Sequence, residues 1–201
     1  ARGEIFWVEA VVALIRAKAV EQGDPDGPSL EVIADSGERT HQSVLEALKR
    51  HVTRGFIIES EVSEIRGQKE FRFAYPPIWN LVYDHIDEVE RCRYHRIISQ
   101  WLELRPEGRG MEVQEEVGRH LELAGDRAPA AQSYRRAADL ARLGHFNDKA
   151  IRLYQQALAC VGDQDVGTRI QLWHDLGSIF QLRGDYEKAL AAFEKMLRLS
   201  W

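Results

Sequence analysis

The sequence predicts a mainly α protein of two parts, and three features of the pattern support this. Apolar residues recur at the spacing of amphipathic helices through most of the 201 residues. Strand-like alternation of apolar and polar residues is confined to residues 56–75. From residue 111 onward, Gly-Asp turns separate consecutive helical segments. We therefore expect an N-terminal domain with one β-hairpin, followed by an array of α-helical hairpins.

The first half predicts three helices before the β-hairpin. Residues 4–20 are apolar almost all round, which is typical of a helix buried on several sides. A short helix from Leu30 to Asp35 should end at Gly37, and Thr40 can cap a third helix from His41 to Arg54. The buried stripe of this third helix would consist of Val44, Leu45, Leu48 and Val52.

Two strands should follow, at residues 56–62 and 69–75, joined by a turn at residues 66–68. Three helices and a β-hairpin outline a winged helix, in which residues 41–54 would occupy the position of a DNA recognition helix. The first domain, residues 1–88, is therefore expected to be winged-helix-like, with the hairpin as its wing.

The charge of this domain argues against a DNA-binding role. Residues 1–88 carry 10 Lys and Arg against 16 Asp and Glu, a net charge of −6. A surface that neutralises several phosphates needs a basic face. We expect no contact with nucleic acid, and the alternative is the arm of a transcription regulator that binds DNA through the winged helix. The wing would carry Glu59, Glu61, Glu64 and Glu70 against Arg66 and Lys69.

A connecting segment, residues 89–110, joins the two parts. Asp87 and Glu90 have the spacing of a capping box, so a helix should begin at Glu88 and end near Leu104. Residues 105–110 contain proline and glycine and predict a linker. The second domain would then span residues 111–201.

One stretch of the second domain, W-H-D-L-G-S-I-F-Q-L-R-G-D-Y-E-K-A-L-A-A-F-E-K-M at residues 173–196, resembles a tetratricopeptide (TPR) repeat. Gly184-Asp185 would form the turn, and Ala189 would be small because the two helices cross there. Weaker matches precede it around Tyr134 and Tyr154. We expect five helices, at residues 112–123, 127–143, 146–160, 168–182 and 185–199.

A repeat of this kind binds other proteins and catalyses nothing, so we expect no enzyme activity. Its groove would take an extended peptide or a helix; a solvated face with no partner is the equally simple alternative. No His, Ser/His/Asp or Cys/His arrangement suits a metal or catalytic site, and we expect no cofactor. The expected groove residues are Glu112, Glu115, Arg119 and Glu122 on the first hairpin and Gln171, His174, Ser178 and Gln181 on the last.

The motifs taken together resemble the region that follows the nucleotide-binding core in bacterial signal-transduction ATPases with numerous domains (STAND-type). The resemblance implies a regulatory module that contacts partner proteins and the other domains of its parent chain. This sequence lacks the G-x-x-x-x-G-K-[ST] loop with which that family binds phosphate. In related proteins the winged helix offers a histidine to the bound nucleotide, and Phe73 stands at that position here. We therefore expect no ATP binding. The motifs that carry the resemblance are E-I-F-W at 4–7, F-R-F-A-Y at 71–75, R-C-R-Y-H-R-I-I-S-Q-W-L-E at 91–103 and G-R-H-L-E-L-A-G-D-R-A-P-A-A-Q-S-Y-R-R-A-A at 118–138.

The remaining expectations concern location and assembly. Cys92 and Cys160 are far apart and lack metal-type spacing, which favours free thiols in the cytoplasm. The sequence has no apolar run of membrane-spanning length and no signal peptide. Near the C-terminal edge, Leu190, Leu197 and Trp201 predict self-association, with a homodimer as its simplest form.

Overall fold

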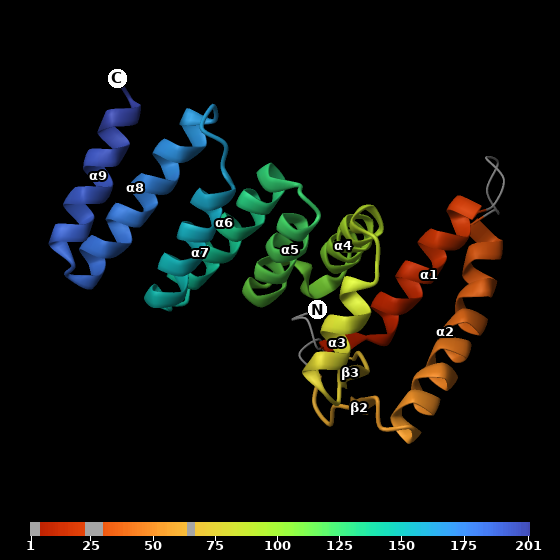
Figure 1. The fold of residues 1–201 in the computed structure, drawn as a ribbon. Helices are drawn as coiled ribbons and strands as arrows, with labels where there is room; N and C mark the ends of the chain where they lie inside the picture. The colour runs from red at the N-terminus through yellow and green to blue at the C-terminus, as the bar shows by residue number, and fades with distance from the viewer. Residues whose placement is uncertain (1–4, 23–29, 64–66) are drawn as a thin grey trace. The chain divides into compact units, whose positions relative to one another are not determined.

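The structure is a computed structural model that describes residues 5–22, 30–63 and 67–201. Within these ranges the chain is mainly α, with nine α-helices and one small antiparallel sheet (Figure 1). It divides into two compact units, Ala1–Trp101 and Leu102–Trp201. The boundary between the units falls inside the predicted connecting segment.

The sheet of the first unit has three strands rather than the two expected. Strands β1 (Ile5–Trp7), β2 (Ile57–Glu59) and β3 (Glu70–Phe73) lie in the order β1-β3-β2. The prediction of a helix over residues 4–20 was wrong at its start, because β1 pairs with β3 in antiparallel register and satisfies one edge of the hairpin.

The pairing of β1 also changes the expected acidic wing. Glu70 is buried, and the indole Nε1 of Trp7 donates a hydrogen bond of 3.2 Å to its Oε2. Glu59 lies 3.2 Å from the Nζ of Lys69, so this pair is locally neutral. Glu64 and Arg66 lie outside the described residues. Glu70, which was counted among the acidic residues of the wing, is therefore not available at its surface.

The expected second and third helices form a single helix. Helix α1 (Val8–Gln22) is followed by α2 (Leu30–Thr53), which continues through Gly37 and Thr40. A glycine inside a helix costs about 1 kcal/mol relative to alanine. Packing of an apolar face against a neighbouring helix can outweigh such a local preference. The stop at Gly55 is confirmed: its φ is +73°, and its N–H donates to the carbonyl of Val52 at 2.9 Å.

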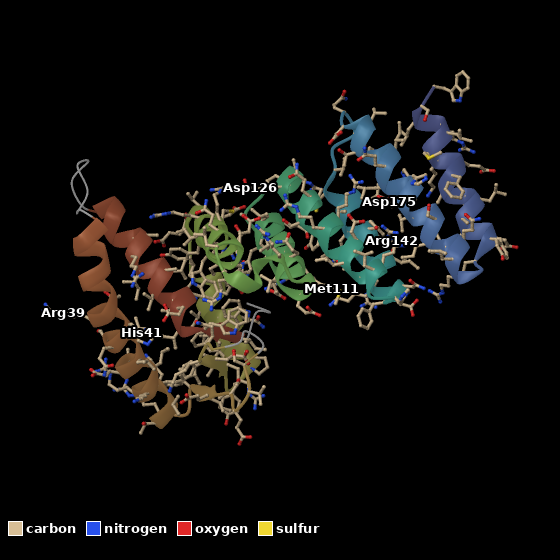
Figure 2. The ribbon with its side chains drawn as sticks, turned by 180° about the vertical axis from the view of Figure 1, so that it is seen from behind. Arg39, His41, Met111, Asp126, Arg142 and Asp175 are labelled. Atoms are coloured by element: carbon tan, nitrogen blue, oxygen red, sulfur yellow. The ribbon has the colours of Figure 1, made fainter. Side chains whose placement is uncertain are left out.

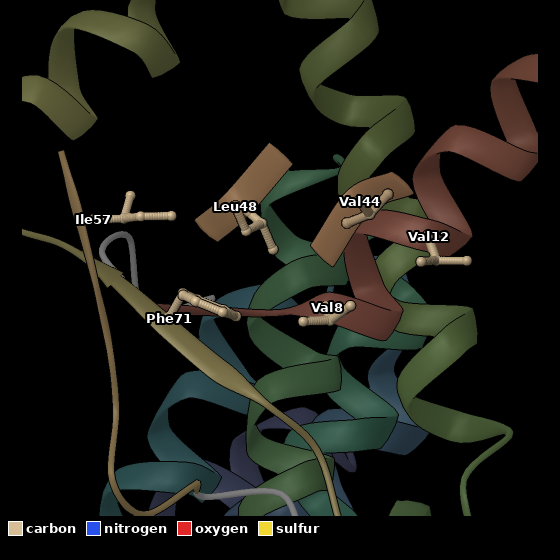
Figure 3. Close-up of a cluster of buried hydrophobic side chains, with 6 residues drawn as sticks. All are labelled: Val8, Val12, Val44, Leu48, Ile57 and Phe71. Carbon is tan, nitrogen blue, oxygen red and sulfur yellow. The ribbon is translucent and has the colours of Figure 1, made fainter. Parts of the chain in front are cut away.

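The core of the first unit gathers residues from both helices and two strands (Figure 3). Val44 and Leu48 of α2 are buried as predicted, and Leu45 and Val52 are partly buried against the same cluster. Phe71 at the centre of β3 is fully buried. The sheet is therefore held by apolar contact with α1 and α2. The six buried members of the cluster are Val8, Val12, Val44, Leu48, Ile57 and Phe71.

Two further helices follow in the first unit: α3 (Pro76–Asp84) and α4 (Glu88–Glu103), whose last two residues belong to the second unit. The predicted start of α4 is confirmed, since the Oδ2 of Asp87 accepts a hydrogen bond from the N–H of Val89 at 3.0 Å. The hydroxyl of Tyr83 lies 2.9 Å from the Nε2 of His95, which fastens α3 to α4.

The second unit holds the helical array. A short 3-10 helix, η1 (Pro106–Arg109), stands where the linker was expected. The five predicted helices are confirmed to within two residues at each end. They are α5 (Met111–Leu123), α6 (Arg127–Leu143), α7 (Asn147–Cys160), α8 (Val166–Arg183) and α9 (Tyr186–Leu199).

Candidate peptide-binding surface

Each hairpin of the array is closed by an aromatic ring packed against a small residue sixteen positions earlier. A Cβ on Gly118 would lie 2.8 Å from Cδ1 of Tyr134, and a Cβ on Gly177 would lie 2.6 Å from Cε1 of Phe193. Ala138 and Tyr154 have the same spacing and are both fully buried. Three equivalent hairpins therefore exist, α5–α6, α6–α7 and α8–α9, and α6 belongs to two of them.

The turns between these helices follow the same scheme. Gly125 and Gly184 adopt φ values of +81° and +84° at the first and last turns. The middle turn has His145 at the equivalent position, with a φ of 61°. A non-glycine residue in this conformation is uncommon. The repeated turn geometry shows that the three hairpins share one backbone design.

Two of the aromatic rings also carry hydrogen bonds. The hydroxyl of Tyr134 donates to Oε2 of Glu122 at 2.9 Å, and that of Tyr154 donates to Oδ1 of Asp139 at 2.6 Å. Burial raises the pKa of both tyrosines, and the carboxylate that accepts each hydrogen bond raises it further. Phe193, in the third hairpin, has no hydroxyl to donate.

Contacts between hairpins define two layers of helices. The Nζ of Lys149 on α7 lies 2.9 Å from Oε2 of Glu115 on α5. Arg135 on α6 reaches α8 twice, with Nη1 2.5 Å from Oε1 of Gln171 and Nη2 3.4 Å from Oδ2 of Asp175. Helix α5 is thus joined to α7, and α6 is joined to α8. Figure 2 labels Arg142 of α6 and Asp175 of α8, which lie near each other.

This layering separates the two predicted sets of groove residues, which were expected to line equivalent places. On α5, both Glu115 and Glu112 face Lys149, and Oε1 of Glu112 lies 4.0 Å from the Nζ of Lys149. Arg119 pairs with Glu116 at 2.8 Å, and Glu122 accepts from Tyr134. These four side chains are engaged by contacts within the unit. Their role in binding a protein stays a prediction.

The α8 set is more open. Gln171 accepts from Arg135, and Ser178 donates to the backbone carbonyl of His174 at 2.9 Å. His174 and Gln181 are exposed, and the His174 ring stands 6.2 Å from that of Phe193. This set lies on the layer that α8 shares with α6.

Sequence reasoning missed the residues of α6 that continue the row. It expected the helix at residues 127–143 to close the first hairpin and also to pair with residues 146–160, and it drew no surface residues from that helix. The 39-residue offset between Tyr154 and Phe193 was the signal that could have found them, because it relates α6 to α8 directly. The residues so related to Gln171, His174, Ser178 and Gln181 are Gln132, Arg135, Asp139 and Arg142.

A cavity of about 440 Å³ adjoins this row beside α6. Its lining includes two guanidinium groups, from Arg109 and Arg136, and the carboxylate of Asp139. The Nε2 of Gln114, also in the lining, donates to the backbone carbonyl of Gly108 at 2.5 Å. We define the α6–α8 surface as the row of exposed and half-buried polar residues on α6 and α8, formed by Gln132, Arg135, Asp139, Arg142, Gln171, His174, Ser178 and Gln181.

The described ranges also bear on metal binding and on membrane insertion. There, no three His, Cys, Asp or Glu side chains gather in an arrangement that could hold a metal ion. Among the helices in that part of the chain, none combines the length and apolar character needed to cross a bilayer. Cys160 is buried, which raises the pKa of its thiol, and Cys92 is half-buried.

Comparison with known proteins agrees with the hairpin geometry of the last repeat. The tetratricopeptide repeat family matches residues 170–200, which hold most of α8 and all of α9. This segment is a TPR repeat, a class of motif that mediates protein–protein interactions. No curated protein matches the sequence. The crystal structure of MamA is similar at 17% identity, covering 57% of this chain and 75% of that chain, with a TM-score of 0.32.

Proposed function

We propose that this chain is a non-catalytic protein-interaction module that binds an extended peptide or a helix across the α6–α8 surface. The observation that carries the proposal is the bridge from Arg135 to Gln171 and Asp175. It holds α6 beside α8, so that their polar residues form one row. Stacked helical repeats characteristically bind partners along such rows.

The chemistry of the surface suits a polypeptide partner. Arg142 and His174 can donate hydrogen bonds, while Gln132 and Gln181 can both donate and accept. A peptide backbone offers one N–H and one C=O per residue, and amide side chains match both. The two arginines of the adjoining cavity would favour an acidic side chain at one end of the peptide.

Selection from a random peptide library displayed on phage, with the whole chain as bait, tests this proposal. We expect enriched peptides to lose binding when Gln132, Arg142 and Gln181 are all replaced by alanine. A matched control replaces Arg152, Gln155 and Gln156 of α7, which are exposed and have the same residue types. Peptides that lose binding only with the control variant, or no enrichment at all, would overturn the proposal.

The wider setting is a further part of the proposal. We infer a regulatory module of a bacterial STAND-type signalling ATPase in the cytoplasm, in which the first unit acts as a winged-helix-like arm. The support is the set of sequence motifs that carry the resemblance, together with a β-hairpin that follows helices in the first unit. Reading the gene upstream of the codon for Ala1 tests this: a phosphate-binding loop in the same reading frame supports it, and an unrelated domain refutes it.

A further inference from the structure

An apolar stripe runs along the outer side of α9. Tyr186, Leu190 and Leu197 are 70%, 62% and 52% exposed, and Trp201, just beyond the helix, is fully exposed. The first three recur at helical spacing, so they form one continuous face. Exposed apolar side chains gathered on one face mark an interaction surface.

The array itself shows what kind of partner fits this stripe. The 39-residue offset relates α9 to α7, and it relates Leu190 to Ile151. Ile151 is only 7% exposed, whereas Leu190 is 62% exposed. Helix α7 packs against its neighbours α6 and α8. The face of α9 around Leu190 is therefore open where the equivalent position of α7 is covered.

The stripe is also complementary to itself. Leu190 and Leu197 are symmetric about a point between Phe193 and Glu194, and so are Tyr186 and Trp201. A two-fold axis through that point would place two α9 helices antiparallel. Leu190 would then meet Leu197 of the second copy, and Tyr186 would meet Trp201. Such matching of one patch with itself is what a two-fold interface requires.

The charges along the stripe support the same arrangement. Glu187 and Arg198 lie on one flank of α9, near opposite ends of the helix. An antiparallel pairing brings each Glu187 within about one turn of Arg198 on the other copy. Two lysines do not crowd this interface, because Lys188 lies over the ring of Phe180 and Lys195 over that of Trp173.

We propose that α9 forms a homodimer interface by packing antiparallel against α9 of a second copy. This inference does not depend on the peptide-binding role of the α6–α8 surface. A single pair of helices lies at the small end of specific interfaces, so the dimer dissociates on dilution.

Sedimentation equilibrium of the whole chain over a range of concentrations tests the interface. We expect a monomer–dimer equilibrium, and a monomer throughout for the variant with Leu190→Glu and Leu197→Glu. Leu143→Glu is the matched control, because Leu143 is 69% exposed on α6, and it should still dimerise. An unmodified chain that is monomeric at every concentration, or a dimer that survives the double substitution, refutes the proposal. A monomer that instead binds a synthetic peptide of residues 166–183 would assign the stripe to a further repeat helix.

Disulfide cross-linking tests the register. In a background with Cys92→Ser and Cys160→Ala, one preparation carries Leu190→Cys and another carries Leu197→Cys. Mixed under mild oxidation, they should form a mixed disulfide dimer. Each preparation alone should not, because equal positions in an antiparallel pair lie about 10 Å apart along the axis. Cross-linking of each preparation with itself would show a parallel pair and overturn the inference.

Discussion

Gly118 allows α5 and α6 to approach closely, because the absence of a side chain leaves room for the ring of Tyr134. That ring is 1% exposed and is held at its hydroxyl by Glu122, so it cannot move aside freely. We expect Gly118→Ala to destabilise the chain by about 1–3 kcal/mol, since the overlap outweighs the gain in helix propensity. Urea unfolding followed by circular dichroism measures the change.

Two related positions serve as controls for this prediction. Gly177→Ala should cost less, because its neighbour Phe193 is half-buried and lacks a hydrogen bond that fixes the ring. Ala138, the equivalent residue of the middle hairpin, is a buried alanine sixteen positions before the buried Tyr154. Ala138→Gly should therefore destabilise, by about 1 kcal/mol from the helix glycine alone. A Gly118→Ala variant that is more stable than the parent would show that the α5–α6 spacing is adjustable.

The buried tyrosines predict sensitivity to alkali. Tyr134 and Tyr154 have pKa values raised above the usual value of about 10, so the fold favours their neutral form. Their contribution to stability is fully present below about pH 10. Above it, unfolded tyrosines ionise while the folded ones stay neutral, and stability falls by up to about 1.4 kcal/mol per pH unit for each.

Melting temperatures measured from neutral pH to pH 12 test this behaviour. The double variant with Tyr134→Phe and Tyr154→Phe should lose less stability above pH 10 than the parent. It should be less stable than the parent at neutral pH, by about 1 kcal/mol for each hydrogen bond removed. Tyr75→Phe, at an exposed site, is the control and should change neither quantity. Parallel curves for the double variant and the parent would contradict the assignment.

At the scale of the element, one glycine inside α2 and one just after its end should respond oppositely to substitution by alanine. Gly37 lies inside the helix, whereas Gly55 follows its end with a φ of +73°. We expect Gly37→Ala to stabilise the chain by about 0.5–1 kcal/mol through helix propensity. Gly55→Ala should destabilise it by about 1–2 kcal/mol, because a Cβ is strained in the left-handed region. Thermal unfolding compares the two. Loss of stability in Gly37→Ala would instead indicate a break in the helix at that point.

The elements that sequence predicted well are those whose signals are local. The five helices of the second unit are bounded by Gly125-Asp126, Gly184-Asp185 and similar turns, and their apolar periodicity is unbroken. The continuity of α2 was missed because Gly37 and Thr40 are genuine local stop and start signals. Helix α2 packs against α1 through Val44 and Leu48, and no local pattern reports that packing.

Other features depend on partners distant in the chain. Residues 5–7 are a strand only because β3, more than sixty residues later, lies beside them. Surface positions of α8 could be chosen from the sequence because the repeat is regular there, whereas those of α6 depend on how the hairpins stack. The α5 residues have the right spacing for a groove, yet Lys149 and Tyr134 engage Glu115 and Glu122.

At the scale of the whole molecule, the net charge predicts that the chain does not bind duplex DNA, and the loop sequences predict that it does not bind nucleotides. The net charge of the chain is −5: residues 1–88 have a net charge of −6, and the remaining residues have a net charge of +1. We expect no measurable binding of duplex DNA at physiological salt, since the net negative charge of residues 1–88 repels phosphates. Fluorescence anisotropy with a labelled duplex measures this. Binding that weakens with salt and disappears on replacing Lys49 and Arg50 would favour the DNA-binding alternative.

We also expect that the chain does not bind ATP or ADP. Phe73 lies against the rings of Phe6 and Trp79, at centroid distances of 5.6 and 5.7 Å. It offers no hydrogen bond to a phosphate, and the sequence contains no Walker-type loop. Calorimetric titration with ATP and with ADP should show no heat of binding, and micromolar affinity would refute the expectation.

Because α6 belongs to two hairpins, the helices of the array should unfold locally in two groups. Because α6 packs extensively on both α5 and α7, while α8 packs extensively on α9 and only lightly on α7, local opening should follow that division. Amide protons of α5, α6 and α7 should exchange with deuterium at one common rate under native conditions. Those of α8 and α9 should share a second, faster rate, so the matched repeat would be released first. A single exchange rate for all five helices would show that the light α7–α8 contact is enough to make the array one cooperative unit.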